Sequence, residues 1–427
     1  MQDKLNRQKN QWNVIFLDDW VIPTTWETVS INEVKWLPTC LSGRQACLSG
    51  RQVSKAVRYK LFSFKQKSTD FIVEEELPFT LSWQGDVFFV FFEKRNINTM
   101  DVVNHLCNTC NISRLTLGIA GLKDKKAITR QRICIYKSAL KKLGGERVFL
   151  QRLEEKVKIL KTDWHTQPVG MTIPIRNIFH IRLRANKHLS LQEKEITKKK
   201  ITSLCEKWFP NLFWSQRFGV QWINPQQGKN ILSGKLKIRD KQERLFKIQS
   251  YASKMCNEYI YSRTKKWLEI LDGDIIEITD SKNFAKKQRG VYQSKTQIVK
   301  IFDINKRNKD FFYYPNDFQK EIPFDEQTMM ITAPVVWYNL LLPQPNTAAG
   351  VREKSFLDSQ WLNTKSLKLC MEYKIFGIRR PIRVFPQKVK ISYQGDNVLL
   401  NFWLPSGSYA SIMIDKLEQA VWINISD

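Results

Sequence analysis

The chain has 427 residues, with 69 Lys and Arg against 41 Asp and Glu, and its formal net charge of +28 favours a nucleic acid as partner. Hydrophobic residues make up 42% of the chain, which excludes a disordered protein, and the length predicts two domains with an additional segment. No apolar run reaches the roughly 18 residues of a membrane-spanning helix, so we expect no membrane anchor.

Residues 1–60 differ from the rest of the chain. They begin with "MQDKLNRQKNQ", which lacks the apolar core of a secretion signal, and they contain few periodic segments. The seven residues "CLSGRQA" at 40–46 are followed by "CLSGRQV" at 47–53, and two copies are too few for a repeat fold. We interpret this part as an N-terminal extension of unknown role.

The next segments predict two strands and a helix. Residues 70–79 and 86–95 are rich in β-branched and aromatic side chains and are bounded by turn residues, which is typical of strands. Apolar residues recur at helical spacing over 99–110, and Thr99 or Asp101 can cap the start of this helix.

The cysteines indicate a reducing compartment and no metal site. Eight Cys are scattered along the chain, too sparsely for a disulfide framework, and we expect a cytoplasmic protein. Cys107 and Cys110 lie near His105, but no second ligand pair accompanies them. Two half-buried thiols on one helix face are therefore favoured over zinc.

A basic loop separates an apolar run at 115–121 from a predicted strand at 128–136. Four cations surround one carboxylate, that of Asp124, in "GLKDKKAITRQ" at 121–131: Lys123, Lys125, Lys126 and Arg130. Nearby cations favour the charged form of a carboxylate, which is then a good nucleophile, and they can also hold RNA phosphates. A solvated turn, a phosphate-binding loop and an ionised nucleophile all remain open on these residues alone.

A second strand pair is predicted at 169–175 and 177–185. An enzyme that acts on a base in folded RNA must take the nucleotide out of its stack and hold it against an aromatic surface. Phe179 is a candidate for this surface, although a place in the strand core is the commoner fate of such a residue. Asn177 points to the same strand face, and its amide can bind the edge of a uracil.

The composition changes near residue 200. Basic clusters at 182–200 and 229–247 precede a long helical pattern at 240–271, and strand-like alternation returns in the tail, where 397–414 is predicted to form strands joined by a turn. Strands, then helices, then strands predict an α+β domain interrupted by an insertion.

Several blocks resemble the TruD-type pseudouridine synthases. The loop 121–131 is similar to the family's central motif, and further similar blocks follow the family's order: "KQKSTDFIVEE" at 65–75, "NIFHIRLR" at 177–184, "FPNLFWSQRFG" at 209–219, "RRPIRVFP" at 379–386 and "FWLPSGSYAS" at 402–411. Within these blocks Leu212 stands where the family usually has Tyr and Trp214 where it has Gly, which puts the substrate preference in question.

The resemblance implies an α+β catalytic domain with a mixed, largely antiparallel sheet, interrupted by a helix-rich TRUD domain. It places an N-terminal extension at 1–60, the first part of the catalytic domain at 61–202, the insertion at 203–376 and the last catalytic strands at 377–427. It also implies an RNA substrate, chiefly tRNA with a D-stem uridine as target, no metal or organic cofactor, and no protein partner.

The same resemblance assigns roles to particular residues. Asp124 is the implied nucleophile, Phe179 the ring that stacks on the target uracil, and Asn177 part of its pocket. The remaining residues implied in substrate binding are Lys65, Phe71, Lys123, Gln216, Arg217, Phe218 and Gly219.

Two other functions compete with this one. A metal-dependent nuclease could use the carboxylates of Asp70, Glu74, Glu75 and Glu76, although consecutive strand residues alternate between faces. Activity that survives excess EDTA would eliminate it. The second alternative is an RNA-binding protein without catalysis.

Overall fold

The structure is a computed structural model that describes residues 14–17, 20–23, 57–59, 61–170, 176–264, 269–279, 287–303, 310–315, 317–326, 328–360, 364–420 and 423–425. The tandem copies at 40–53, most of the extension 1–60 and residues 171–175 of the strand predicted at 169–175 lie outside these residues.

The larger sheet has nine strands. In spatial order they are β21 (Gln387–Gln394), β22 (Asn397–Pro405), β10 (Arg176–Ala185), β5 (Phe71–Glu76), β8 (Ile128–Tyr136), β6 (Val87–Arg95) and β9 (Lys158–His165), with β4 (Phe62–Phe64) beside β10 and β7 (Leu117–Ile119) beside β8. The pair β5 and β8 is parallel, and the other neighbouring pairs are antiparallel. This confirms the predicted mixed, largely antiparallel sheet.

Strand alternation decides which side chains of this sheet face the core. Along β10 buried and half-buried residues alternate, so Asn177 and Phe179 lie on the inner face. They pair with Glu75 and Val73 of β5 and with Leu404 and Phe402 of β22. The inner faces of three strands therefore meet around Phe179.

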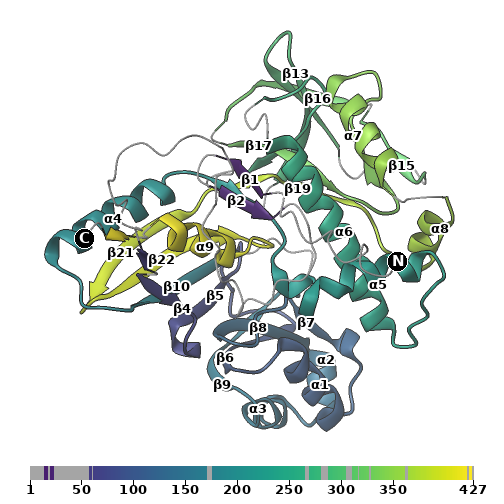
Figure 1. Ribbon diagram of the computed structural model, residues 1–427. Coiled ribbons are helices and arrows are strands. Elements are labelled where there is room, and N and C mark those ends of the chain that lie inside the picture. The colour runs from purple at the N-terminus through teal and green to yellow at the C-terminus, as the bar shows by residue number, and fades with distance from the viewer. Residues whose placement is uncertain are drawn as a thin grey trace, which may run out of the picture.

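Three helices cover the β6, β8 and β9 half of the sheet, in the lower part of Figure 1: α1 (Thr99–Cys110), α2 (Lys137–Lys142) and α3 (Glu146–Glu154). The cap of α1 differs from the prediction. Asn98 is the N-cap, and its N–H donates to Oδ2 of Asp101 at 3.3 Å. Thr99 is not the cap because its hydroxyl is turned inward and donates to Oε1 of Gln131.

The β10 and β22 half of the sheet is bordered by α4 (Leu191–Cys205) and α9 (Ala410–Ala420). The strand predicted for the end of 397–414 was wrong, because β22 is followed by a turn and then by α9. The start of α9 is buried on every side, so its sequence has no exposed positions to reveal a helical period.

The chain between α4 and β21 contains a second sheet. Its six antiparallel strands are β16 (Phe318–Pro323), β14 (Ile298–Phe302), β13 (Lys287–Gln293), β12 (Ile275–Thr279), β17 (Met329–Val335) and β19 (Ile378–Pro381). The helices of this region are α5 (Ile223–Leu232), α6 (Lys241–Thr264), α7 (Ala348–Ser359) and α8 (Thr364–Glu372). The expectation of a helix-rich insertion was therefore incomplete, because short charged strands such as β16 give weak sequence signals.

Short strand pairs complete the fold. They are β11 (Phe209–Pro210) with β20 (Arg383–Val384), β15 (Phe312–Tyr313) with β18 (Leu340–Leu341), β1 (Val14–Leu17) with β2 (Trp20–Pro23), and β3 (Val57–Tyr59) with β23 (Ile423–Ile425). After the second sheet, the chain contributes β21 and β22 to the nine-stranded sheet, whereas β19 belongs to the six-stranded sheet. The domain boundaries at 202/203 and 376/377 stay predictions.

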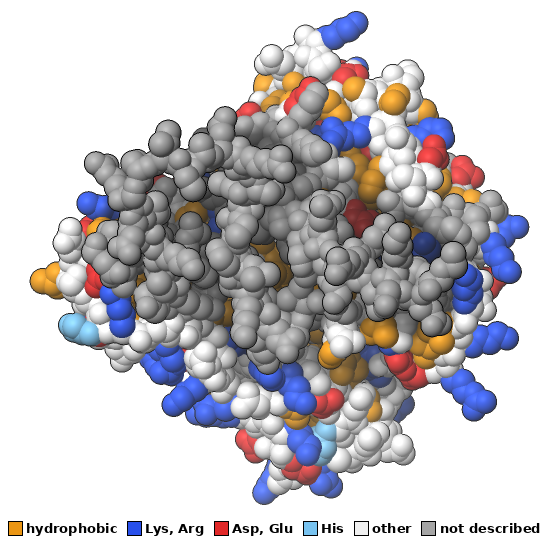
Figure 2. Space-filling model, viewed as in Figure 1, with side chains coloured by type: hydrophobic (Ala, Val, Ile, Leu, Met, Phe, Trp, Pro, Cys, Tyr) orange, Lys and Arg blue, Asp and Glu red, His pale blue; other side chains and the backbone are white. Residues whose placement is uncertain are grey.

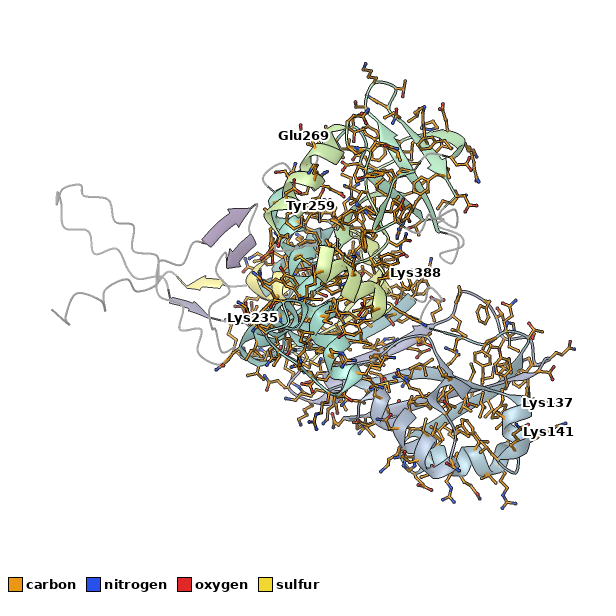
Figure 3. All side chains as sticks on the ribbon, turned by 90° about the vertical axis from the view of Figure 1, so that its right-hand side faces the viewer. Lys137, Lys141, Lys235, Tyr259, Glu269 and Lys388 are labelled. Atoms are coloured by element: carbon orange, nitrogen blue, oxygen red, sulfur yellow. The ribbon has the colours of Figure 1, made fainter. Side chains whose placement is uncertain are left out.

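Cations are distributed widely over the surface. Lys and Arg side chains lie around much of the rim of the face in Figure 2. Lys137 and Lys141 of α2 lie at the right-hand edge of the lower part of the molecule, well away from Lys388 of β21 (Figure 3). The positive charge is thus not confined to one patch. Among the helices described, none combines the length and the apolar stretch that crossing a bilayer needs.

Candidate active site

Asp124 lies in the loop that joins β7 to β8, as predicted. The two strands pair antiparallel, so the loop is presented at the end of a rigid hairpin. Oδ2 of Asp124 accepts a hydrogen bond from Nζ of Lys65 at 2.9 Å, and the two side chains are 27% and 17% exposed. The carboxylate is therefore held in place yet remains reachable from solvent.

Lys65 connects the carboxylate to an aromatic cluster. Its backbone adopts a left-handed conformation with φ of 57°, and its Nζ lies 4.1 Å from the ring centre of Phe71. The partner of Asp124 thus comes from 59 positions upstream and not from the basic loop itself.

The lysine is expected to matter for turnover more than for folding. Replacing Lys65 with Met should lower kcat by about 10- to 100-fold, because Asp124 loses the contact that orients it. The free energy of unfolding should change by less than about 1 kcal/mol, since the pair is partly exposed. Parallel measurements of kcat and thermal unfolding check this, and an unchanged kcat would contradict it.

A buried lysine that the sequence did not single out supports the loop from beneath. Nζ of Lys94 donates to the backbone oxygens of Asp124 and Ile97, both at 2.8 Å, and to that of Lys123 at 3.4 Å. Its side chain is 1% exposed. Burial lowers the pKa of Lys94 to about 8, against the opposing charges of Asp124 and Asp101.

The alternation of residues in the sequence of β6 could have identified Lys94. In β6 the residues Phe88, Val90, Phe92 and Lys94 occupy alternate positions, so the lysine stands where the strand period demands a buried side chain. A lysine is almost never fully buried without a partner. The inward glutamate at the end of β5, Glu75, gives the same signal.

The side chain of Lys123 is engaged elsewhere and does not bind Asp124. Its Nζ donates to Oε2 of Glu75 at 3.2 Å, and the two side chains are nearly inaccessible. Its backbone N–H donates to the hydroxyl of Thr99, which in turn donates to Gln131. These bonds fix the start of the loop, and they leave the ammonium group of Lys123 closed to a phosphate.

The other cations of the loop form no ion pair with Asp124 among the described residues. Lys125 and Lys126 are exposed. Arg130 binds Glu74 and Glu93, at 3.2 and 3.0 Å. The cationic cage suggested by the sequence is thus replaced by one ion pair with Lys65.

Phe179 lies in an aromatic stack behind Lys65. Its ring is stacked on that of Phe402 with centroids 5.3 Å apart, and the ring of Phe71 lies 5.9 Å away. Phe179 is only 5% exposed, and Phe402 covers one face of its ring. Its predicted role in stacking on uracil stays a prediction.

Asn177 carries an unused hydrogen-bond acceptor beside this stack. The residue is 8% exposed, and its Oδ1 is buried without a hydrogen-bond partner among the described residues. A buried acceptor without a partner costs free energy, and this oxygen is available to accept a hydrogen bond.

The carboxylates considered for a nuclease do not form a common site. Asp70 accepts two hydrogen bonds from Arg184, at 2.7 and 2.8 Å, while Glu74 and Glu75 bind cations on opposite faces of β5. Throughout the described part of the chain, no three His, Cys, Asp or Glu side chains gather as metal ligands.

The block 209–219 contacts α6 and the main hydrophobic cluster. Arg217 donates to Ser253 and Gln249 of α6, and Phe218 is fully buried and stacked on Trp222. Gln216 is exposed, and Gly219 has φ of 78°, where an added Cβ would lie 2.6 Å from the side chain of Asn224. These contacts do not bring residues 216–219 to Asp124, and Leu212 and Trp214 pack in or against the main hydrophobic cluster.

The chain matches known proteins along most of its length. A family described as tRNA pseudouridine synthase D (TruD) matches residues 62–239 and 236–417. The tRNA pseudouridine synthase D of Haemophilus influenzae strain 86-028NP is 24% identical over 83% of this chain and 92% of that protein. The enzyme of the same name from Histophilus somni is 28% identical over 83% of this chain and 93% of that protein.

A solved structure shows the same fold. It is a crystal structure from Methanosarcina mazei, described as a candidate tRNA pseudouridine synthase D, with a TM-score of 0.51 and 17% identity over 86% of this chain and 95% of that chain. The matches confirm the resemblance drawn from the sequence blocks and the predicted fold class. The chain therefore belongs to the TruD family of tRNA pseudouridine synthases, which are isomerases.

Proposed function

We propose that this enzyme converts one uridine in the D-stem region of tRNA to pseudouridine, with Asp124 as the nucleophile. The observation that carries the proposal is the ion pair of Asp124 with Lys65, which sets a partly accessible carboxylate beside an aromatic stack. A carboxylate paired with an ammonium group stays ionised, as a nucleophile requires.

The reaction itself is an internal transfer. The bond from C1′ of the ribose to N1 of uracil breaks, the base turns, and C1′ becomes bonded to C5. The proton leaves C5 and N1 gains one, so the conversion is redox-neutral and balances without a co-reactant. Asp124 can serve by adding to the base, by attacking the sugar or by removing a sugar proton, and each role needs the ionised form.

The other site residues support this chemistry in the proposal. Phe179, backed by Phe402 and Phe71, provides the apolar surface against the uracil. The unpartnered Oδ1 of Asn177 accepts a hydrogen bond from N3–H of the base. A site of this kind excludes water while the glycosidic bond is broken, which prevents loss of the base.

The remaining predictions belong to the same proposal. The proposed domains are the extension 1–60, the catalytic parts 61–202 and 377–427, and the insertion 203–376. We propose that the enzyme is cytoplasmic, does not bind a membrane, and acts on RNA without a cofactor or a protein partner.

Mapping pseudouridines in cellular RNA tests the substrate. Carbodiimide-based sequencing of RNA from cells with and without this protein should show a D-stem site in tRNA that is lost when the protein is absent. Other pseudouridines serve as internal controls and should keep their levels. An unchanged tRNA profile, or a loss confined to other RNAs, would refute the proposed substrate.

A further inference from the structure

Two arginines away from Asp124, one buried and one half-buried, have no acidic ion-pair partner among the described residues. Arg217 lies in the short turn before Phe218, and Arg380 lies in β19 and is 8% exposed. Neither forms an ion pair with a carboxylate among the described residues. Burial lowers the pKa of both. At Arg380 this is opposed by Cys256, Tyr409 and Glu277 and increased by the charge of Arg217. Uncompensated buried charge of this kind is costly unless an anion joins it.

Neutral acceptors hold both guanidinium groups in fixed positions. Nε of Arg380 donates to the backbone oxygen of Asn211 and Nη2 to that of Gly407, both at 2.7 Å. Nε of Arg217 donates to Ser253 at 3.2 Å and Nη2 to Gln249 at 3.1 Å. In each arginine Nη1 has no hydrogen-bond partner within the described part of the chain, so both N–H donors of each Nη1 remain unused.

Both guanidinium groups lie near the ring of Phe213. The central carbon of Arg380 lies 4.2 Å from the ring centre of Phe213, and that of Arg217 lies 5.9 Å from the same centre. The ring of Tyr409 lies 6.2 Å from Phe213 and 6.0 Å from Arg380. Both positive groups are thus gathered around one ring.

The turn between β22 and α9 adds a third group. Ser408 is 8% exposed, and its Oγ is buried without a hydrogen-bond partner among the described residues. In the same turn Gly407 has φ of 84°, and a Cβ there would lie 3.4 Å from Nη1 of Arg380. The absence of that Cβ leaves room beside the unused donors.

This cluster lies near the proposed uridine pocket. Leu404 of β22 pairs with Asn177, and Phe402 pairs with Phe179. Gly407 follows Leu404 by three residues, which places its Cα within about 10 Å of that of Leu404. Because Nη2 of Arg380 donates to the backbone oxygen of Gly407, Arg380 lies beside a turn that begins three residues after the strand neighbour of Asn177.

We propose that Arg217, Arg380 and Ser408 form a binding site for one phosphate of the RNA backbone, adjacent to the uridine pocket. The proposal rests on the proposed function, because RNA supplies the anion. Phosphate oxygens accept hydrogen bonds from the two Nη1 groups and from the Ser408 hydroxyl, and arginine suits such oxygens through charge and planar geometry. The arriving phosphate supplies the counter-charge that the two arginines lack.

Salt-dependent binding of unmodified tRNA transcripts tests this site. Arg217→Gln should raise Kd about tenfold and lower the slope of log Kd against log salt by about one, because one fewer counterion is released. Ser408→Ala should raise Kd a few-fold with an unchanged slope and melting temperature, since it removes a neutral hydroxyl without a partner. Arg147→Gln removes an exposed charge on α3 and is the matched control, with binding as in the wild type.

The outcome separates this inference from the proposed function. A folded Arg217→Gln variant with the wild-type Kd and slope would overturn the phosphate site, as would an unaffected Ser408→Ala variant. Arg380 is left unchanged because its bonds to backbone oxygens hold the fold together. If the wild type made no pseudouridine in these transcripts, the proposed function would fail, whereas the difference in salt slope would still report the phosphate contact.

Discussion

An Asp124→Asn variant is expected to form pseudouridine on the order of 10⁴-fold more slowly than the wild type while binding tRNA with nearly the same Kd. The amide has almost the shape of the carboxylate but carries no charge, so it is a poor nucleophile and a poor base. Lys65 would lose its counter-charge, and because its side chain is 17% exposed, water can solvate it. Pseudouridine in tRNA, detected with carbodiimide, and tRNA binding by filter retention measure the two effects.

A matched control separates chemistry from charge. Asp358 of α7 is exposed and pairs with Lys354 at 2.8 Å, far along the chain from the catalytic loop. Asp358→Asn changes the net charge by the same amount and should leave both the rate and Kd unaltered. Equal pseudouridine from Asp124→Asn and the wild type would refute the catalytic role of Asp124.

A Lys94→Met variant is expected to lose about 100-fold in kcat with little change in the KM for tRNA. Lys94 touches only backbone oxygens of the loop and of Ile97, so its loss displaces Asp124 and leaves RNA-binding surfaces alone. A displacement of about 1 Å at a catalytic group costs on the order of 100-fold in rate. Steady-state kinetics on tRNA give kcat and KM, and Lys158→Met on the exposed edge of β9 is the matched control.

The pH dependence of this variant gives a second test. The pKa of Lys94 is about 8 in the folded protein and 10.5 for an unperturbed lysine, with Asp124, Asp101 and Lys123 as the charged groups that face it. Between these values the unfolded chain binds more protons, so this group makes the protein more stable as pH rises from about 8 to 10.5.

Activity should change in the opposite direction. Above pH 8 the neutral amine donates two hydrogen bonds instead of three, so the wild-type kcat should fall along an alkaline limb. Lys94→Met should lack both that limb and the matching gain in unfolding free energy. A variant with the wild-type pH profile would show that Lys94 does not position the loop.

Much of the larger sheet could be predicted from the sequence because its strands alternate. β5, β6 and β8 lie within the predicted segments, and β10 begins one residue before the segment predicted at 177–185. Asp124 lies in the predicted loop between strands. The helix α6 was also predicted, since its apolar residues recur at helical spacing. These features depend on local periodicity, which a single sequence displays.

The missed features depend on contacts between distant residues. The ion-pair partner of Asp124 is Lys65, which local sequence cannot distinguish from the four neighbouring cations. Lys123 is drawn away by Glu75, which is far from it in sequence. The second sheet was missed for a similar reason, because its charged edge strands pair with partners that lie elsewhere in the chain.

A crystal structure of the Asp124→Asn variant bound to tRNA tests the central claim most directly. The account predicts a uridine turned out of its helix, with its uracil against Phe179 and the side chain at position 124 in van der Waals contact with C1′ or with the base. A bound tRNA whose nearest nucleotide lies beyond contact distance of that side chain would contradict it.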